Sequence, residues 1–367
     1  MQDQGRARSY HRKRRVLSVA GFLLDSSLLG VLLFSGVSAA MRDRAYHVST
    51  HPAVALLVYL LLIGIIVKLA GLPLDYLSGY RLEHSYGLSN LTPAAWAKDQ
   101  LKGFLVGAAL LGAGIEIIYG TLRRWPDHWW VIAGSVFVLF FIVLANLAPV
   151  VLFPIFFKFK PLENPSLVER LSELCRRAGT RVQGVFEWKL SEKTKKANAA
   201  LVGLGNTRRI ILADTLLENF TPPEIETVLA HELGHHVHRH ILRGILLQSA
   251  TTFLGFYLVH QALAKFSTRF DLSGPSDFAN LPLISLIVTA LSLLLMPFVN
   301  GHSRRMERQA DAYAIRSTGD GAAFISGMEK LAEINLAERQ PHPLIEFFFS
   351  SHPSIEKRVA FARQFTS

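Results

Sequence analysis

The sequence predicts a multi-pass α-helical membrane protein that carries an α+β domain outside the bilayer. Hydrophobic residues make up 50% of the 367 positions and charged residues only 18%, a balance that fits a soluble protein poorly. Apolar runs of about 20 residues, enough helix to cross about 30 Å of hydrocarbon, recur along the chain. Two long polar stretches flank the last two runs and supply the residues of the second domain.

The apolar runs predict about six membrane spans. Each run is long enough to cross the bilayer as a helix, and polar segments separate most of them. The runs are residues 16–40, 53–72, 103–120, 129–153, 241–263 and 282–299.

The net charge of +11 is concentrated near the N-terminus. Basic flanks of a span stay in the cytoplasm, so the N-terminus and, after six spans, the C-terminus are predicted to be cytoplasmic. A direct contact with lipid or nucleic acid is the less favoured alternative for this segment. We therefore expect the lipid bilayer, and no nucleic acid, among the partners. The basic residues are Arg6, Arg8, Arg12, Lys13, Arg14 and Arg15.

The spans divide the polar residues into parts that face one compartment. The last two spans form a hairpin, so the polar stretches before and after it lie on the same side and can form one domain. The predicted order is a basic cytoplasmic N-terminus at 1–15, a region of four spans at 16–157 with a cytoplasmic loop at 73–102, the first part of the polar domain at 158–240, a transmembrane hairpin at 241–299 and the second part at 300–367.

The first polar stretch contains both helix and strand patterns. Apolar spacing predicts a helix at 166–178, and residues 182–190 are typical of a strand. Two further strand-like runs surround the turn-rich residues 203–206 and predict a β-hairpin. Thr221, two prolines and Glu224 then form a capping box, which predicts the start of a helix.

That helix carries the pattern H-E-x-x-H. His231 and His235 are four residues apart and therefore project from one helical face, with Glu232 beside them. A hydrolytic zinc site uses three protein ligands and lowers the pKa of a water molecule towards about 7. Glu232 is placed to take the proton of that water and pass it to a leaving amine. The pattern predicts peptide hydrolysis with one Zn²⁺ per chain.

The third zinc ligand must come from elsewhere in the chain. The extended metalloprotease motif needs a histidine six residues after His235, and that position holds Ile241. Glu307 can complete a two-histidine, one-glutamate site, and Asp311 can hydrogen-bond a liganding imidazole. The hairpin at 241–299 brings the two segments together. The neighbouring His236, His238 and His240 are predicted to be solvated or interfacial residues at the membrane boundary.

Five segments resemble those of the type I CAAX prenyl proteases, integral-membrane zinc endopeptidases related to bacterial membrane quality-control metalloproteases. Residues 80–102 resemble the prenyl-protease branch in particular. The resemblance implies a gluzincin-type zinc-peptidase domain on the cytoplasmic side of the membrane. The segments are "YRLEHSYGLSNLTPAAWAKDQLK" at 80–102, "KANAALVGLGNTRRIILADTLL" at 196–217, "HELGHH" at 231–236, "SRRMERQADAYA" at 303–314 and "SSHPSIEKR" at 350–358.

The resemblance also implies a role for each matching residue. It makes His231, His235 and Glu307 the zinc ligands, Glu232 the general base and Asp311 a support of the site. It implies that His352 contacts the oxyanion or the substrate backbone, that Arg304 forms a salt bridge beside the ligand helix, and that Asn198 and Ala199 lie on an edge strand where substrate docks. Independently, the run at 197–204 is of the kind that accepts an extended peptide by β-augmentation. A simple strand-start role for Asn198 remains the alternative.

The expected function is zinc-dependent endoproteolysis within a membrane protein. The expected substrate is a peptide or protein that is prenylated or tethered to the membrane. A general quality-control protease without prenyl specificity is the alternative, and a silent zinc-stabilised scaffold or a transporter is a remote one. Because the chain is shorter than eukaryotic prenyl proteases, which have seven spans, we expect a prokaryotic plasma (inner) membrane as its location. The sequence leaves the natural substrate and the oligomeric state open.

Overall fold

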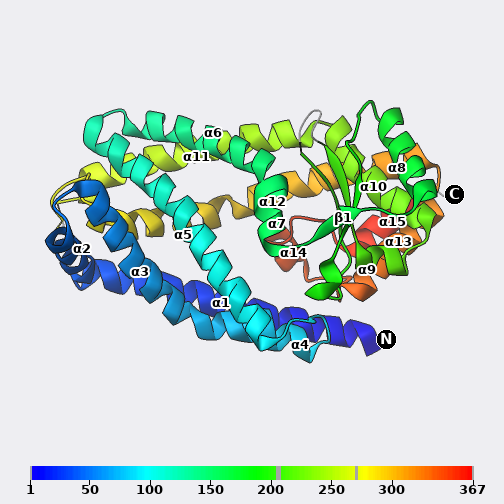
Figure 1. Cartoon of the computed structure of the whole chain (residues 1–367), viewed down its shortest axis with the longest axis horizontal. Coiled ribbons are helices and arrows are strands. Elements are labelled where there is room, and N and C mark those ends of the chain that lie inside the picture. Colours follow the sequence, from blue (N-terminus) through cyan, green and yellow to red (C-terminus); the bar gives the residue numbers. More distant parts are fainter. Residues whose placement is uncertain (1, 204–207, 269–271, 366–367) are drawn as a thin grey trace.

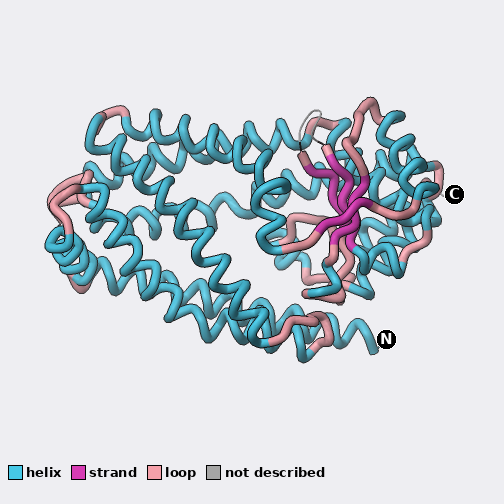
Figure 2. Tube along the Cα trace, in the orientation of Figure 1, coloured by secondary structure: helices cyan, strands magenta, loops and turns pink. Residues whose placement is uncertain are grey.

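The computed structural model describes residues 2–203, 208–268 and 272–365. Long helices occupy one end of the molecule, and a smaller unit of helices around one sheet occupies the other (Figures 1 and 2). The N-terminus and the C-terminus both lie at the end that holds the sheet (Figure 1).

Six of the described helices are long and apolar enough to cross a membrane, which confirms the predicted number of spans. Helices α11 and α12 are the two arms of the late hairpin, and α11 packs along α6. The six are α1 Gln2–Phe34, α3 Pro52–Asp75, α5 Pro93–Arg124, α6 Trp129–Leu147, α11 His240–Phe266 and α12 Leu281–Thr318.

The predicted end of the first span, at residue 40, is wrong. Helix α1 stops at Phe34, and α2 (Val37–Val48) begins after Gly36, which has a φ of 73°. Glycine adopts this left-handed conformation without a steric penalty, so the chain turns here instead of continuing to residue 40. Ser38 Oγ then bonds Tyr59 on α3, at 2.7 Å from its hydroxyl oxygen.

The predicted cytoplasmic loop at 73–102 is mostly helical. Helix α3 continues through a π-helical segment and a short helix, and α5 begins at Pro93, so only residues 86–92 connect the two. The additional segments are η1 Tyr76–Leu82 and α4 Glu83–Ser85.

The short connection docks on the sheet-containing unit. Ser89 pairs with Thr194 in an antiparallel bridge, and Glu83 Oε2 forms a 2.8 Å ion pair with Lys196 Nζ. His84 holds the connection from within, because its ring nitrogens contact the carbonyl oxygens of Tyr80 and Leu91, each at 2.8 Å.

The sheet has four strands in the order β1-β2-β4-β3. Strands β2 and β4 are parallel, and the two outer pairings are antiparallel, so β1 and β3 form the edges. The antiparallel pair β3 and β4 confirms the two strands predicted around residues 203–206, although residues 204–207 of the turn lie outside the described chain. The strands are β1 Phe159–Pro161, β2 Val185–Trp188, β3 Ala199–Val202 and β4 Arg209–Ala213.

Helices cover this sheet and enclose one apolar core. Leu171, Leu212, Leu229 and Phe324 are examples of its fully buried side chains, and they come from α8, β4, α10 and α13. The helix predicted at 166–178 is α8. The helices are α8 Pro165–Arg177, α9 Asp214–Asn219, α10 Pro222–Val237, α13 Gly321–Ile334, α14 Pro343–Phe349 and α15 Ile355–Arg363, with the short segments η2 Ala148–Leu152, α7 Phe153–Phe156, η3 Leu190–Glu192 and η5 Phe278–Asn280.

Helix α10 begins as its sequence predicts. The Thr221 backbone N–H donates to Glu224 Oε2 at 2.8 Å, which is one half of the capping box. Ser326 and Lys330 of α13 donate to the same carboxylate at 2.6 and 2.7 Å. The cap therefore also anchors α10 to α13.

Candidate metal and catalytic site

The site forms where α10 packs against α12. A Cβ added at Gly234 would lie 2.8 Å from Ala310 Cα on α12, so only glycine permits this close approach. The hairpin of α11 and α12 returns the chain from the end of α10 to its side, as the sequence predicts. The two helices thus hold their polar side chains against each other.

Three side chains converge at this contact. His231 Nε2 lies 3.2 Å from His235 Nε2 and 3.2 Å from Glu307 Oε2, and His235 Nε2 lies 3.4 Å from Glu307 Oε1. One ligand atom from each of the three lies within 4.8 Å of the others. The structure therefore brings together the set predicted from the sequence.

The donor set fits a divalent metal ion. Two imidazole nitrogens and a carboxylate oxygen are the ligands of many hydrolytic zinc sites. Glu307 Oε2 is buried and lies 3.2 Å from His231 Nε2, so one cation could contact both atoms. Burial alone would lower the pKa of His231, but hydrogen bonds to Asp311 and Glu307 raise it to about 9. A metal ion bound at this point would take the place of a proton.

A buried ion pair of Asp311 and Arg358 lies beside His231 Nδ1. This Nδ1 lies 2.8 Å from Asp311 Oδ1, and Arg358 donates to both oxygens of that carboxylate at 2.6 and 2.9 Å. With Nδ1–H donated to Asp311, the lone pair of Nε2 points towards the ligand position. Sequence reasoning missed Arg358, although it is the last residue of the segment "SSHPSIEKR".

A second chain of hydrogen bonds holds His235. His240 Nδ1 lies 3.0 Å from His235 Nδ1, and Gln309 Oε1 lies 2.9 Å from His240 Nε2. His240 is only 3% exposed, so the prediction that it is solvated or interfacial is wrong. The chain turns tightly at Arg239, which has a φ of 54°. This turn places His240, the first residue of α11, against His235.

Glu232 and His352 face one cavity of about 430 Å³ beside the three converging side chains. Burial raises the pKa of Glu232, while the nearby imidazoles oppose this increase. His352 Nε2 lies 3.5 Å from Glu307 Oε1, and its side chain is 60% exposed. The lining of the cavity thus includes a carboxylate and an accessible imidazole.

Edge strand β3 also borders this cavity through Leu201, and Gly203, the residue after the strand, lines it as well. The predicted docking residues lie at the opposite end: Ala199 is the first residue of β3, Asn198 precedes it, and neither lines the cavity. The prediction of an edge strand is confirmed. The sequence did not identify Leu201 and Gly203, which line the cavity. Alternation of side chains alone does not tell which end of a strand meets a site.

Arg304 contacts the protein backbone. Its Nη1 donates to the carbonyl oxygens of Glu346 at 2.9 Å, Phe347 at 3.3 Å and Ser350 at 2.6 Å. Among the described residues no carboxylate pairs with it, in contrast to the predicted salt bridge. Arg304 satisfies carbonyl groups at the end of α14 and so fixes the segment that leads to His352.

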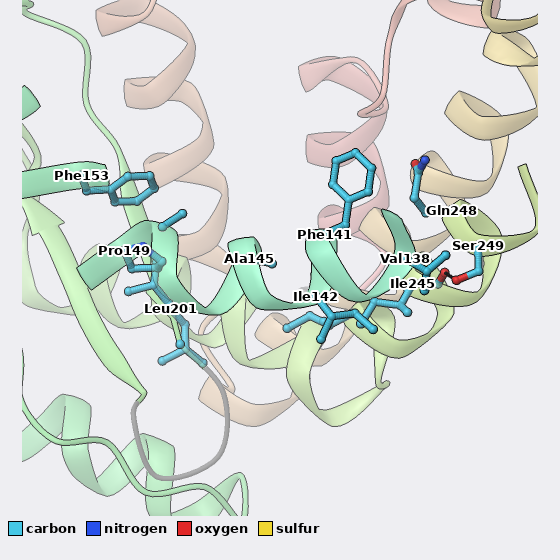
Figure 3. A pocket seen from close by; sticks show the side chains of 15 residues that line it. Val138, Phe141, Ile142, Ala145, Pro149, Phe153, Leu201, Ile245, Gln248 and Ser249 are labelled. Carbon is cyan, nitrogen blue, oxygen red and sulfur yellow. Dashed lines mark hydrogen bonds between the residues drawn. The ribbon is translucent and has the colours of Figure 1, made fainter. Parts of the chain in front are cut away.

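An apolar cavity of about 590 Å³ adjoins the site (Figure 3). It shares Leu201, Gly203 and Ile241 with the cavity of Glu232. Its other walls come from α6 and the segments after it, such as Ala145, and from α11. An apolar group can therefore lie in this cavity while a peptide bond lies beside Glu232.

Known proteins resemble the chain along nearly its full length. The profile of peptidase family M48 matches residues 161–366, and the profile described as CAAX prenyl protease N-terminal, five membrane helices, matches residues 2–158. The uncharacterized metalloprotease YhfN of Bacillus subtilis is 32% identical over 98% of this chain and 85% of its own length.

Further similarity comes from eukaryotic proteins. CAAX prenyl protease 1 of Saccharomyces cerevisiae is 28% identical over 96% of this chain and 84% of its own. The crystal structure of S. mikatae Ste24p superposes with a TM-score of 0.88 at 25% identity, covering 98% of this chain and 88% of that one.

Proposed function

The chain belongs to peptidase family M48 and carries the N-terminal membrane region of the CAAX prenyl proteases, and from this premise we propose how its site hydrolyses a peptide bond. The protein is an integral membrane metalloendopeptidase that acts on peptide or protein substrates. We propose that His231, His235 and Glu307 hold one Zn²⁺ ion per chain. The observation that carries this proposal is the convergence of one ligand atom from each within 4.8 Å.

Glu232 is the proposed general base and acid. When bound, the metal ion supplies Lewis acidity that polarises the substrate carbonyl and a water molecule. Glu232 takes a proton from the water as it attacks and gives the proton to the leaving amine. Partial burial of its carboxyl, which raises its pKa, favours the second half of this cycle.

The remaining polar side chains position the reacting groups. Asp311 fixes the tautomer of His231, and we propose the same role for His240 towards His235, each through an Nδ1 contact. His352 lines the same cavity as Glu232, and we propose that it donates to the developing oxyanion. Arg304 supports His352 through the backbone that precedes it.

Substrate is proposed to bind as an extended strand along β3. Strand β3 is an edge of the sheet, so its outer backbone groups can pair with a peptide by β-augmentation. Asn198 and Ala199 would contact the part of the peptide farther from the scissile bond, and Leu201 and Gly203 the part next to it.

We propose a prenylated or otherwise membrane-tethered protein as the substrate. The apolar cavity next to the site supports this proposal, because its volume of about 590 Å³ can hold a prenyl chain (Figure 3). The proposed location is the plasma (inner) membrane of a prokaryote, with both termini and the peptidase domain in the cytoplasm. The basic N-terminal segment and the Bacillus relative support this orientation and location. The domain division predicted from the sequence is part of this proposal, except that most of the predicted loop at 73–102 is helical.

A comparison of wild type with Glu232→Gln tests the reaction. Both proteins are purified in detergent, their zinc content is measured, and cleavage of one CAAX peptide is followed in farnesylated and unmodified forms. We expect both proteins to bind one zinc ion and only wild type to cleave. Substantial turnover by Glu232→Gln would contradict the mechanism. Equal cleavage of both peptides would favour a general quality-control protease over prenyl specificity.

A further inference from the structure

Four of the six basic N-terminal residues of α1 fall into two groups. Those of the first group contact the protein: Arg6 donates to the carbonyl oxygen of Tyr86 at 2.8 Å, and Arg15 pairs with Glu338 at 2.7 Å. These contacts fasten the N-terminal half of α1 to the connection after α4 and to the peptidase domain. The second group, Arg12 and Lys13, is exposed, although Lys13 Nζ also lies 5.3 Å from the centre of the Tyr86 ring.

Arg12, Lys13 and Arg81 line one groove. All three side chains are exposed, and they line a cavity of about 540 Å³ together with Val16, Leu17 and Leu77. The groove lies between α1 and η1, which contact each other and run side by side along the lower edge of Figure 1. None of the ion pairs among the described residues includes Arg12, Lys13 or Arg81.

The groove lies where the apolar part of α1 begins. The apolar part of α1 starts at Val16, whose side chain is 62% exposed, and Arg12 precedes it by one helical turn, about 6 Å along the axis. The headgroup layer adds roughly 5–8 Å to each side of the hydrocarbon. The three cations therefore lie at the level of the headgroups, while Val16 and Leu77 lie at the level of the first acyl carbons.

We propose that this groove binds the headgroup phosphate of an anionic phospholipid. Each arginine guanidinium group can bind two phosphate oxygens at once, and Lys13 adds a third positive charge to those of Arg12 and Arg81. Basic pockets between membrane helices at the headgroup level recognise anionic lipids in this way. Val16, Leu17 and Leu77 would cover the acyl chains of the same lipid. This inference depends on the membrane spans and is independent of the proposed peptidase reaction.

Native mass spectrometry of the full-length protein in detergent tests the inference. Wild type is titrated with dioleoyl phosphatidylglycerol, with dioleoyl phosphatidylcholine and with inorganic phosphate. We expect the first phosphatidylglycerol to bind at least about tenfold more tightly than phosphatidylcholine or phosphate, because each cation near the surface adds several-fold in affinity. Equal binding of the two lipids, or phosphate binding as tight as that of phosphatidylglycerol, would overturn the proposal.

Substitutions locate the lipid. The triple variant R12Q/K13Q/R81Q is compared with R8Q/K98Q/R124Q, which removes the same charge from exposed positions outside the groove. We expect the first variant to lose about ten- to hundredfold of its affinity for phosphatidylglycerol and the second to lose less than threefold. Equal losses would mean diffuse attraction and would refute the site. The single variant R81Q is measured as well. Thermal unfolding of every variant shows whether a loss of lipid binding is caused by a loss of folding.

Discussion

His240 Nδ1 lies 3.0 Å from Nδ1 of His235, so a buried histidine outside the H-E-x-x-H motif contacts one of the proposed ligands. Gln309 Oε1 accepts from His240 Nε2 at 2.9 Å, which leaves His240 Nδ1 to accept from His235. The lone pair of His235 Nε2 is then available at the proposed metal position, beside His231 and Glu307. Asp311 sets the same tautomer at His231, and the two proposed histidine ligands are oriented by different partners.

His240→Ala is therefore expected to weaken metal binding about 10- to 100-fold, the usual cost of removing a partner of a liganding histidine. Competition with a zinc chelator measures the affinity directly, without reference to activity. His238→Ala is the matched control, because His238 stacks on His240 but contacts no proposed ligand. Unchanged zinc affinity in His240→Ala would remove His240 from the site.

Gly234→Ala should separate the two ligand-bearing helices. The added methyl group would lie 2.8 Å from Ala310 Cα and 3.1 Å from its carbonyl oxygen, and backbone cannot move aside as a side chain can. We expect a loss of about 1–3 kcal/mol in stability and a lower zinc content, measured by thermal unfolding in detergent and by elemental analysis. Gly107→Ala on α5, where a Cβ meets nothing within 4 Å, should leave both unchanged. A stable Gly234→Ala protein with full zinc would show that α10 and α12 tolerate a wider separation.

Ala145→Phe should fill the apolar cavity and change substrate preference. Ala145 lines this cavity (Figure 3) and does not line the cavity of Glu232. A phenyl ring here competes with a prenyl group for the same space, so we expect kcat/KM for a farnesylated peptide to fall at least about tenfold. Cleavage of an unmodified peptide serves as the internal measure of an intact site.

Ala109→Phe is the control for this substitution, because Ala109 is exposed on α5 and lies outside the cavity. An equal effect of Ala145→Phe on both peptides would assign the cavity to the peptide rather than to its lipid.

The features predicted correctly from the sequence are those with local causes. The spans follow from the length of apolar runs, and the start of α10 follows from the cap at Thr221 and Glu224. The common helical face of His231 and His235 on α10 follows from helical periodicity alone. Glu307 required one further step, the hairpin that returns α12 to α10, and that step is also visible in the order of the spans.

The features missed depend on contacts between distant segments. Arg358 reaches Asp311 from another helix, across 47 positions of the chain, and no local pattern marks such a pair. His240 seemed to belong to the membrane boundary because it starts an apolar run, but a left-handed residue, Arg239, turns it inward. The contacts of Arg304 could not be foreseen either, because backbone carbonyl groups carry no signal in a sequence.

Glu224 makes the stability of the peptidase domain depend on pH. Burial alone would raise the pKa of this carboxyl, but hydrogen bonds from Lys330, Ser326 and Thr221 lower it to about 2, from an ordinary value of 4.5. A folded pKa below the unfolded one stabilises the protein above pH 4.5, and this stabilisation is lost as the pH falls from 4.5 to about 2. The shift corresponds to at most about 3 kcal/mol at neutral pH.

Glu224→Gln should therefore unfold at a lower temperature than wild type at pH 7, and the difference should shrink as the pH falls below 4.5. Thermal unfolding in detergent at several pH values measures both proteins. Glu218→Gln, at an exposed position of α9, controls for the loss of one negative charge. A difference that stays constant from pH 7 to pH 3 would mean that the glutamine removes packing or geometry at the cap, and that the ionised carboxylate is not what joins α10 to α13.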